Sequence, residues 1–141
     1  MNISDILRHK GSAVVTIAST GKVRDLVAEL AEHKIGALVV VDGDSVIGVA
    51  SERDVVYRLH ERGAEVLDAP VSEVMTAHVV TCSSKDSVDS VAATMTERRI
   101  RHMPVLDDGT LNGIVTIGDV VSIRIRQLEH DRGQLEQYIT G

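Results

Sequence analysis

Two short motifs in this sequence pair a hydroxyl residue with a carboxylate three positions later. Ser51 precedes Asp54, and Thr116 precedes Asp119. At the start of a helix this spacing places both side chains within one turn. A carboxylate there can accept hydrogen bonds from two neighbouring hydroxyl groups, and free backbone N–H groups can meet an anionic oxygen. The alternative is plain helix capping, with the aspartate stabilised by the helix dipole.

The two motifs belong to a longer internal repeat with an offset of 65 residues. The segment 14–56 aligns without a gap on the segment 79–121, and 14 of the 43 aligned pairs are identical. Val14-Val15-Thr16 returns as Val79-Val80-Thr81, and the Asp54 motif returns as the Asp119 motif. The chain is therefore a duplication, and one structural unit should occur twice.

Each repeat contains the same succession of local signals. The β-branched run from 14 to 17 predicts a strand. Apolar residues at helical spacing then predict a helix over 23–30 and again over 88–95, the second beginning at Asp86. A hairpin follows, with turns at 42–44 and 107–109, and a last helix starts at Ser51 or Thr116. We expect the first of these last helices to end at Gly63. The sequence thus predicts an α/β (α+β) fold of two βαββα repeats packed together.

These segments resemble the cystathionine β-synthase (CBS) domain, which normally occurs as a tandem pair called a Bateman module. The resemblance lies in the hairpin strands and the Gly-apolar-x-Ser/Thr-x-x-Asp pattern, present at 48–54 and at 113–119. On this basis we expect CBS repeat 1 over 1–66, CBS repeat 2 over 67–126 and a C-terminal helical tail over 127–141.

The resemblance implies a function as a regulatory sensor with clefts between the two repeats. Such clefts bind adenosine-containing ligands, so AMP, ADP, ATP, NAD or S-adenosylmethionine are the expected ligands, and no obligatory cofactor is expected. The aspartates and their hydroxyl partners would hold the ribose, while apolar strand residues and their backbone would hold adenine. By resemblance, basic residues next to these segments would meet phosphate, which guanidinium groups bind in a bidentate fork. The expected ligand-binding residues are Val15, Thr16, Ile35, Ser51, Arg53, Asp54, Val80, Thr81, Ile100, Arg101, His102, Ile114, Thr116 and Asp119.

The two copies differ where phosphate would bind. Gly36-Ala37 stands in the first repeat where Arg101-His102 stands in the second, and Gly118 stands where the first has Arg53. Because each cleft borrows residues from both repeats in this family, the basic residues could converge on one phosphate region. Arg98 and Arg99 are interpreted as a solvated helix end, and His102 could instead be a hydrogen-bonded edge-strand residue.

Composition excludes several other functions. A formal net charge of −6 and only 1% aromatic residues argue against a nucleic-acid partner. The longest apolar run is far too short to cross a bilayer. The six histidines lack metal-ligand spacing, no glycine-rich phosphate loop is present, and Cys82, the only cysteine, aligns with Ile17 as a buried strand residue. The sequence therefore predicts a non-catalytic cytoplasmic protein without a metal.

The segment 120–139 predicts a further helix with a possible assembly role. Val121, Ile125, Leu128, Leu135 and Ile139 follow alternating four- and three-residue steps, interrupted at position 132. This pattern is similar to a coiled-coil seam. We expect the seam to be buried against a second subunit or the module itself, although Gly133 argues against a long rigid coil. A homodimer and an unknown effector protein are the expected partners. The alternative function is a constitutive interaction module with empty clefts.

Overall fold

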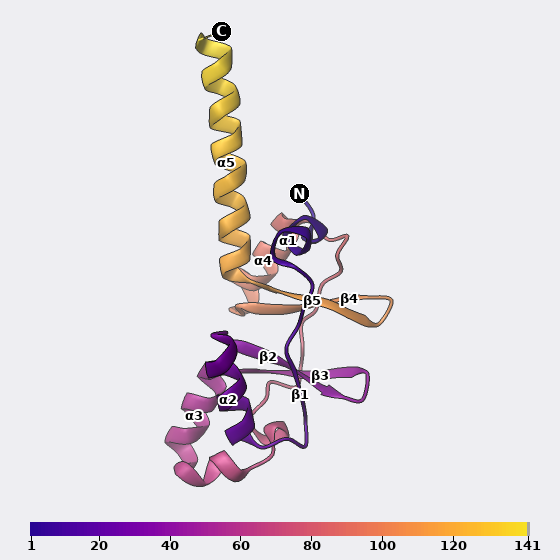
Figure 1. The fold of residues 1–141 in the computed structure, drawn as a ribbon, viewed down its shortest axis with the longest axis vertical. Coiled ribbons are helices and arrows are strands. Elements are labelled where there is room, and N and C mark those ends of the chain that lie inside the picture. Colours follow the sequence, from indigo (N-terminus) through magenta and orange to yellow (C-terminus); the bar gives the residue numbers. More distant parts are fainter. Residues whose placement is uncertain (141) are drawn as a thin grey trace.

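The structure is a computed structural model that describes residues 1–140. It consists of two stacked halves, and one long helix projects from the second half (Figure 1). The predicted mixed α/β fold with paired repeats and a C-terminal helical extension is confirmed.

The first half contains β1 (Thr16–Ala18), α2 (Val23–His33), β2 (Ala37–Asp42), β3 (Ser45–Ser51) and α3 (Glu52–Arg62). The second half contains α4 (Val88–Arg98), β4 (His102–Asp107), β5 (Thr110–Thr116), α5 (Ile117–Thr140) and also α1 (Ile3–Lys10). Two short 3-10 helices, Ala64–Asp68 and Val71–Glu73, lie in the connection.

The sheet of the first half has the order β1-β2-β3, with β1 parallel to β2 and β3 antiparallel to it. The hairpin turns where the sequence predicts, and Gly43 takes the positive φ of 61° that the tight turn requires. Helix α3 begins after Ser51 and ends at Gly63, as predicted. The observed β1 starts two residues later than the predicted strand at 14–17.

The second half repeats this hairpin with β4 and β5, but its first strand is reduced to one bridge between Cys82 and Val105. The chain turns away directly after this bridge. Ser83 Oγ and the Ser84 backbone N–H both donate to Asp107 Oδ1, at 2.9 and 3.0 Å. These bonds hold the turn against the hairpin directly after the bridge. Helix α4 is capped by Ser87, one residue after the Asp86 start predicted from the sequence.

Each half has its own hydrophobic core, and the packing does not follow the order of the chain. Ile3 and Ile6 of α1 are buried in the core of the second half. The linker residues Val66 and Val71 are fully buried in the core of the first half. Helix α1 therefore lies against the second half although the chain continues from it into β1. Because the chain passes from α1 on the second half to β1 in the first, the end of α1 lies beside the start of α5.

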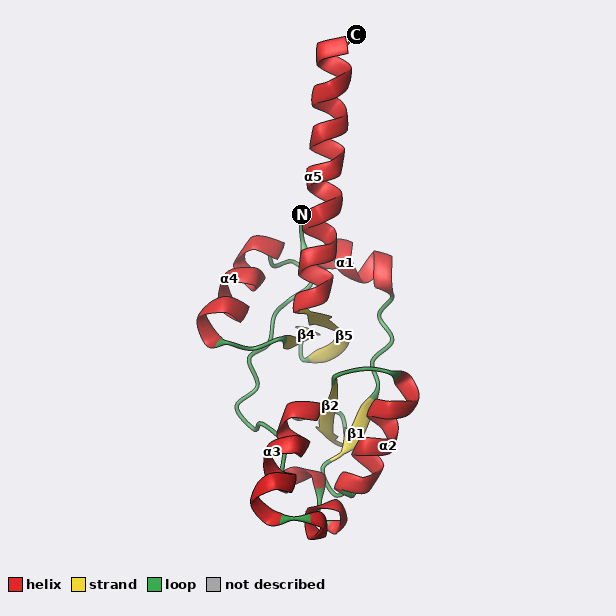
Figure 2. Cartoon of the chain, turned by 90° about the vertical axis from the view of Figure 1, so that its left-hand side faces the viewer, coloured by secondary structure: helices red, strands yellow, loops and turns green. Residues whose placement is uncertain are grey.

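Helix α5 is continuous from Ile117 to Thr140 and extends away from both halves (Figure 2). Val120 and Ile123 are its buried residues, and none of its described residues after Ile123 is buried. The helix does not fold back, so the possibility that its seam is buried against its own module is wrong. Gly133 does not interrupt it, because one glycine costs only about 1 kcal/mol relative to alanine. Within residues 1–140, no helix is long and apolar enough to cross a membrane.

Candidate functional site

The start of α3 carries the first hydroxyl–carboxylate pair. Asp54 Oδ2 accepts hydrogen bonds from the Ser51 backbone N–H and from Ser51 Oγ, both at 2.9 Å. Ser51 Oγ in turn accepts from the Asp54 backbone N–H at 3.2 Å. This is the capping arrangement that the sequence analysis considered. It uses one carboxylate oxygen, and no hydrogen bond to Asp54 Oδ1 occurs among residues 1–140, so capping and ligand binding are compatible.

A cavity of about 530 Å³ opens in front of this helix start. Its wall combines the end of β3 and the start of α3 with the segment before α4 and the segment between α4 and β4. Small-molecule pockets in proteins span roughly 300–1,000 Å³, so this one is large enough for a nucleoside derivative. The lining residues are Gly36, Val49, Ser51, Glu52, Arg53, Asp54, Val56, Tyr57, Thr76, His78, Val79, Val80, Arg99, Ile100, Arg101 and His102.

Basic side chains dominate the charge of the cavity wall. Arg53 follows the start of α3 from the first repeat, while Arg99 and Arg101 come from the second. Glu52 and Asp54 are the acidic residues of the same wall. The guanidinium groups therefore reach the cavity from both repeats, as the sequence comparison between the copies suggested. A concave site with three arginines is suited to an anionic ligand.

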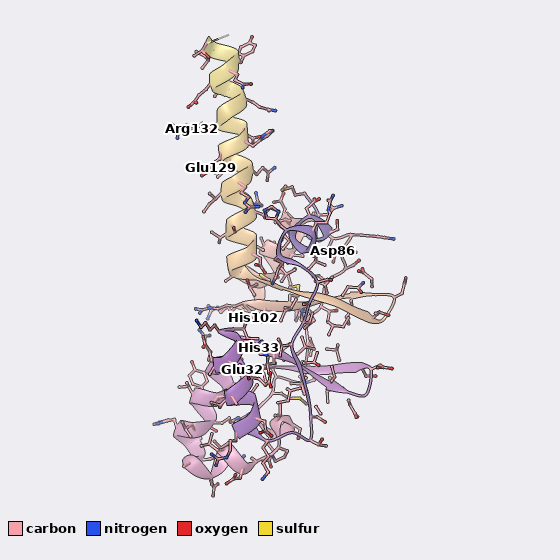
Figure 3. The ribbon with its side chains drawn as sticks, in the orientation of Figure 1. Glu32, His33, Asp86, His102, Glu129 and Arg132 are labelled. Carbon is pink, nitrogen blue, oxygen red and sulfur yellow. The ribbon has the colours of Figure 1, made fainter. Side chains whose placement is uncertain are left out.

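His102 lies where the two halves meet (Figure 3). Its Nε2 approaches Gly36 so closely that a Cβ placed on that glycine would lie 3.4 Å away. Burial lowers the pKa of His102 below its ordinary value. Glu52 opposes this shift, while Arg101 adds to it. The lowered pKa favours the neutral imidazole, which can accept or donate a hydrogen bond without adding charge.

The second hydroxyl–carboxylate pair has different surroundings. Asp119 Oδ2 accepts from the Thr116 backbone N–H at 2.9 Å, and the Asp119 backbone N–H donates to Thr116 Oγ1 at 3.1 Å. The same Oδ2 also accepts from Lys10 Nζ at 2.8 Å. Lys10 Nζ donates further to the Ile114 carbonyl oxygen at 2.8 Å. The hollow beside this group, between α1 and α5, measures about 120 Å³.

Comparison with known protein families gives two matches, one in each repeat. The family model described as the CBS domain matches residues 3–61 and again 71–126, which together are most of the chain. The chain belongs to the CBS-domain family. It is 30% identical, over an alignment of 148 positions including gaps, to the mitochondrial CBS domain-containing protein CBSX3 of Arabidopsis thaliana, covering 99% of this chain and 72% of that protein.

Solved CBS-domain structures share this fold over most of the chain. The CBS-domain containing protein ATU1752 from Agrobacterium tumefaciens has a TM-score of 0.85 and 40% identity, covering 88% of this chain and 99% of that one. The CBS domain pair of protein MJ0100, solved in complex with 5′-methylthioadenosine and S-adenosyl-L-methionine, has a TM-score of 0.80 and 26% identity. That match covers 90% of this chain and 98% of the MJ0100 pair. CBS pairs similar to this one therefore include a protein that binds adenosyl compounds.

In this CBS pair, half of the ligand-binding residues expected from the sequence line a single cavity. They come from both repeats and are Ser51, Arg53, Asp54, Val80, Ile100, Arg101 and His102. Val15 and Ile35 pack instead against the core of the first repeat. Thr16 and Thr81 are exposed and do not line the cavity. Ile114, Thr116 and Asp119 lie at the second helix start, around the end of Lys10.

Several residues of the CBS cavity are not among those expected from the sequence. Arg99 was interpreted as part of a solvated helix end, but it lines the cavity. The reason is its left-handed backbone, with φ of 56°, which ends α4 and turns the chain toward β4. His78, Thr76 and Tyr57 also line the wall. His78 could have been found, because it precedes Val79 and Val80 on the same extended segment.

Cys82 is buried, as predicted, and it lies at the single bridge to Val105 that stands in place of the first strand of the second repeat. Its side chain is 7% exposed, and burial raises the pKa of its thiol to about 12, with Asp86 and Asp107 adding to the shift. Because the pKa is raised, the neutral thiol persists throughout the neutral range and up to about pH 12. We expect a thiol-specific reagent at pH 8 to react about a thousandfold more slowly with the folded protein than with protein in urea. Equal rates in the two conditions would show that Cys82 is accessible.

Proposed function

We propose that this CBS pair is a non-catalytic sensor that binds an adenosine-containing ligand in the cavity between its repeats and passes the ligand state to a partner protein. The observation that carries the proposal is the cavity itself. It brings the Ser51–Asp54 pair, the apolar residues Val80 and Ile100, and basic side chains from both repeats to one space. The adenosyl ligands of the related MJ0100 pair support the ligand class.

Each part of the ligand has a matching surface in this proposal. Asp54 Oδ1 would accept hydrogen bonds from the two ribose hydroxyls, since its Oδ2 is already engaged by Ser51. Val80 and Ile100 would contact the faces of adenine. Arg53 and Arg101 would hold phosphate as bidentate partners. These groups bind and orient the ligand, and none of these roles requires a bond to be broken.

The test of this function is a thermal-shift screen with AMP, ADP, ATP, NAD, S-adenosylmethionine and 5′-methylthioadenosine. A ligand that binds only the folded state stabilises it by about 2.7 kcal/mol at 100 times its dissociation constant. We expect at least one phosphorylated adenosine compound to raise Tm, and guanosine nucleotides to act more weakly. No shift with any member of the panel would instead favour the constitutive interaction module.

Substituting Arg53 and Arg101 tests whether these arginines bind the phosphate of the ligand or only pack against their neighbours. Replacing Arg53 and Arg101 with Ala should weaken AMP binding about tenfold or more, because two charge-assisted contacts are lost. Adenosine, which lacks the phosphate, should lose less than about threefold, and added salt should weaken AMP binding through screening. The matched control is Arg98→Ala at the end of α4, since Arg98 does not line the cavity. Equal losses for AMP and adenosine would show that Arg53 and Arg101 act through packing.

We also propose that two copies of the chain associate through α5. Beyond Ile123 the helix exposes its apolar seam: Ile125 is 51% exposed, Leu128 67% and Leu135 59%. A single helix that displays such a stripe to water is only marginally stable, whereas pairing buries the stripe. The seam begins at Val121, next to the module, so two paired helices would hold their CBS modules close together. An effector protein would then bind a surface formed by both subunits.

A further inference from the structure

Lys10 joins the N-terminal helix to the second CBS motif. Helix α1 is anchored by Ile3 and Ile6, which are buried in the core of the second repeat. From the end of this helix, Lys10 Nζ donates to Asp119 Oδ2 and to the Ile114 carbonyl oxygen, each at 2.8 Å. The side chains of Lys10 and Asp119 are only 30% and 21% exposed. This pair is therefore held by the packing of α1, unlike a freely solvated surface ion pair.

The repeat symmetry shows what Lys10 contacts. The offset of 65 residues maps Asp119 onto Asp54 and Ile114 onto Val49. Both Asp54 and Val49 line the large cavity. Lys10 thus holds, in the second repeat, the counterpart of the Asp54 carboxylate, which lines the cavity in the first. It also holds the counterpart of the Val49 carbonyl oxygen, which in the first repeat accepts from the Thr76 backbone N–H at 2.9 Å. Among residues 1–140, Asp54 has no cationic side chain paired with it, so the two aspartates differ in this respect.

The second cleft is poorer in other ways as well. The residues that correspond to Arg101 and Arg53 are Gly36 and Gly118, so two phosphate contacts have no counterpart there. The apolar residue types are nevertheless kept in the sequence, since Val15 and Ile35 correspond to Val80 and Ile100 of the first cleft.

We propose that the Lys10 ammonium occupies the second cleft as a built-in substitute for a ligand and so limits each chain to one adenosyl ligand. A ribose that approached Asp119 would have to displace a charge-assisted hydrogen bond, leaving the ammonium and the Ile114 carbonyl to find other partners. In the first cleft a ribose meets no such competitor at Asp54. This proposal rests on the proposed function of the cavity and adds that the two clefts are not equivalent.

The experiment measures the number of ligands bound per chain by equilibrium dialysis, with labelled AMP and labelled adenosine as probes. We expect the wild-type chain to saturate at one ligand and Lys10→Met, which keeps an apolar stem without the charge, to saturate at two. The second site should bind AMP and adenosine alike, because Gly36 and Gly118 replace its arginines. Lys10→Arg keeps the positive charge and should stay at one. Lys85→Met removes a lysine that is paired with neither aspartate and is the matched control.

Further variants show which of the two clefts, the one at Asp54 or the one at Asp119, holds each bound ligand. Lys10→Met combined with Asp54→Ala should retain the second site, and adding Asp119→Ala should abolish it. Ligand-free Tm values verify that each variant is folded. If wild type and Lys10→Met both saturate at one ligand, or both at two, the role of Lys10 is overturned while the proposed function stands. If no variant binds either probe, the proposed function fails and the Lys10 proposal fails with it.

Discussion

Replacing Asp54 with Ala is expected to weaken the binding of AMP by about ten- to a hundredfold. The reason is the loss of a charge-assisted contact to ribose worth roughly 1.5–3 kcal/mol, with each 1.4 kcal/mol corresponding to a factor of ten. Isothermal titration calorimetry with AMP and with adenosine measures this directly. Both ligands should lose affinity to the same extent, because both carry the ribose, in contrast to the phosphate variants.

The control for this prediction comes from the duplication itself. Asp119→Ala removes the corresponding carboxylate, which also caps a helix start through the Thr116 backbone N–H. Both substitutions remove the carboxylate that accepts from the backbone N–H of the residue at the helix start, so both should destabilise the fold to a similar extent. Asp54 lines the cavity and Asp119 does not, so the Asp119→Ala variant should bind AMP with wild-type affinity. A folded Asp54→Ala protein with unchanged affinity would remove Asp54 from the site.

The second large effect concerns assembly through α5. We expect the wild-type protein to be a dimer, and Leu128→Glu with Leu135→Glu to shift it to a monomer, raising the dimer dissociation constant by at least about a hundredfold. Burying a leucine is worth roughly 1.5–3 kcal/mol, and the double change places four charges in the seam of the dimer. Sedimentation velocity over a range of concentrations gives the result. AMP binding should persist, since neither leucine lines the cavity.

The matched control adds the same charge beside the seam. Gln127→Glu with Gln134→Glu lies one residue before each leucine and should leave the dimer intact. Substitution is preferable to truncation after Ser122, because Ile123 is buried in the core of the second repeat. If the leucine variant stays dimeric like the control, the subunits meet elsewhere. The exposed Val56 and Tyr57 on α3, each 60% exposed, would then be the next surface to test.

The fold could be predicted from the sequence because its signals are local and occur twice. The two hairpins, the Ser51 cap and the Gly63 end each follow from a few neighbouring residues. The start of α4 was displaced by one residue, because Asp86 accepts a hydrogen bond from the Ser83 backbone N–H and Ser87 takes the capping role.

The site could be predicted only in part, because its asymmetry depends on contacts between distant residues. Lys10 and Asp119 lie 109 positions apart, and nothing local to either predicts their ion pair. The packing of α1 on the second repeat creates it. Arg99 was misread for a similar reason, since its place in the cavity depends on a left-handed residue at the end of α4. Whether α5 continues across Gly133 depends on a cost of about 1 kcal/mol for one glycine in a helix, and a sequence pattern does not resolve so small a difference.

The most direct test of the ligand cavity is a two-dimensional ¹H–¹⁵N NMR titration of the full chain with the compound that gives the largest thermal shift. The account predicts chemical-shift changes concentrated at the backbone amides of Ser51 to Asp54, Val79 to Val80 and Arg99 to His102. The amides of the hairpin turns at Gly43 and Gly109 should stay unchanged and serve as the internal reference. A ligand that stabilises the protein but perturbs amides outside these segments, leaving those of Asp54 and Arg101 unmoved, would contradict the assignment of the cavity as the binding site.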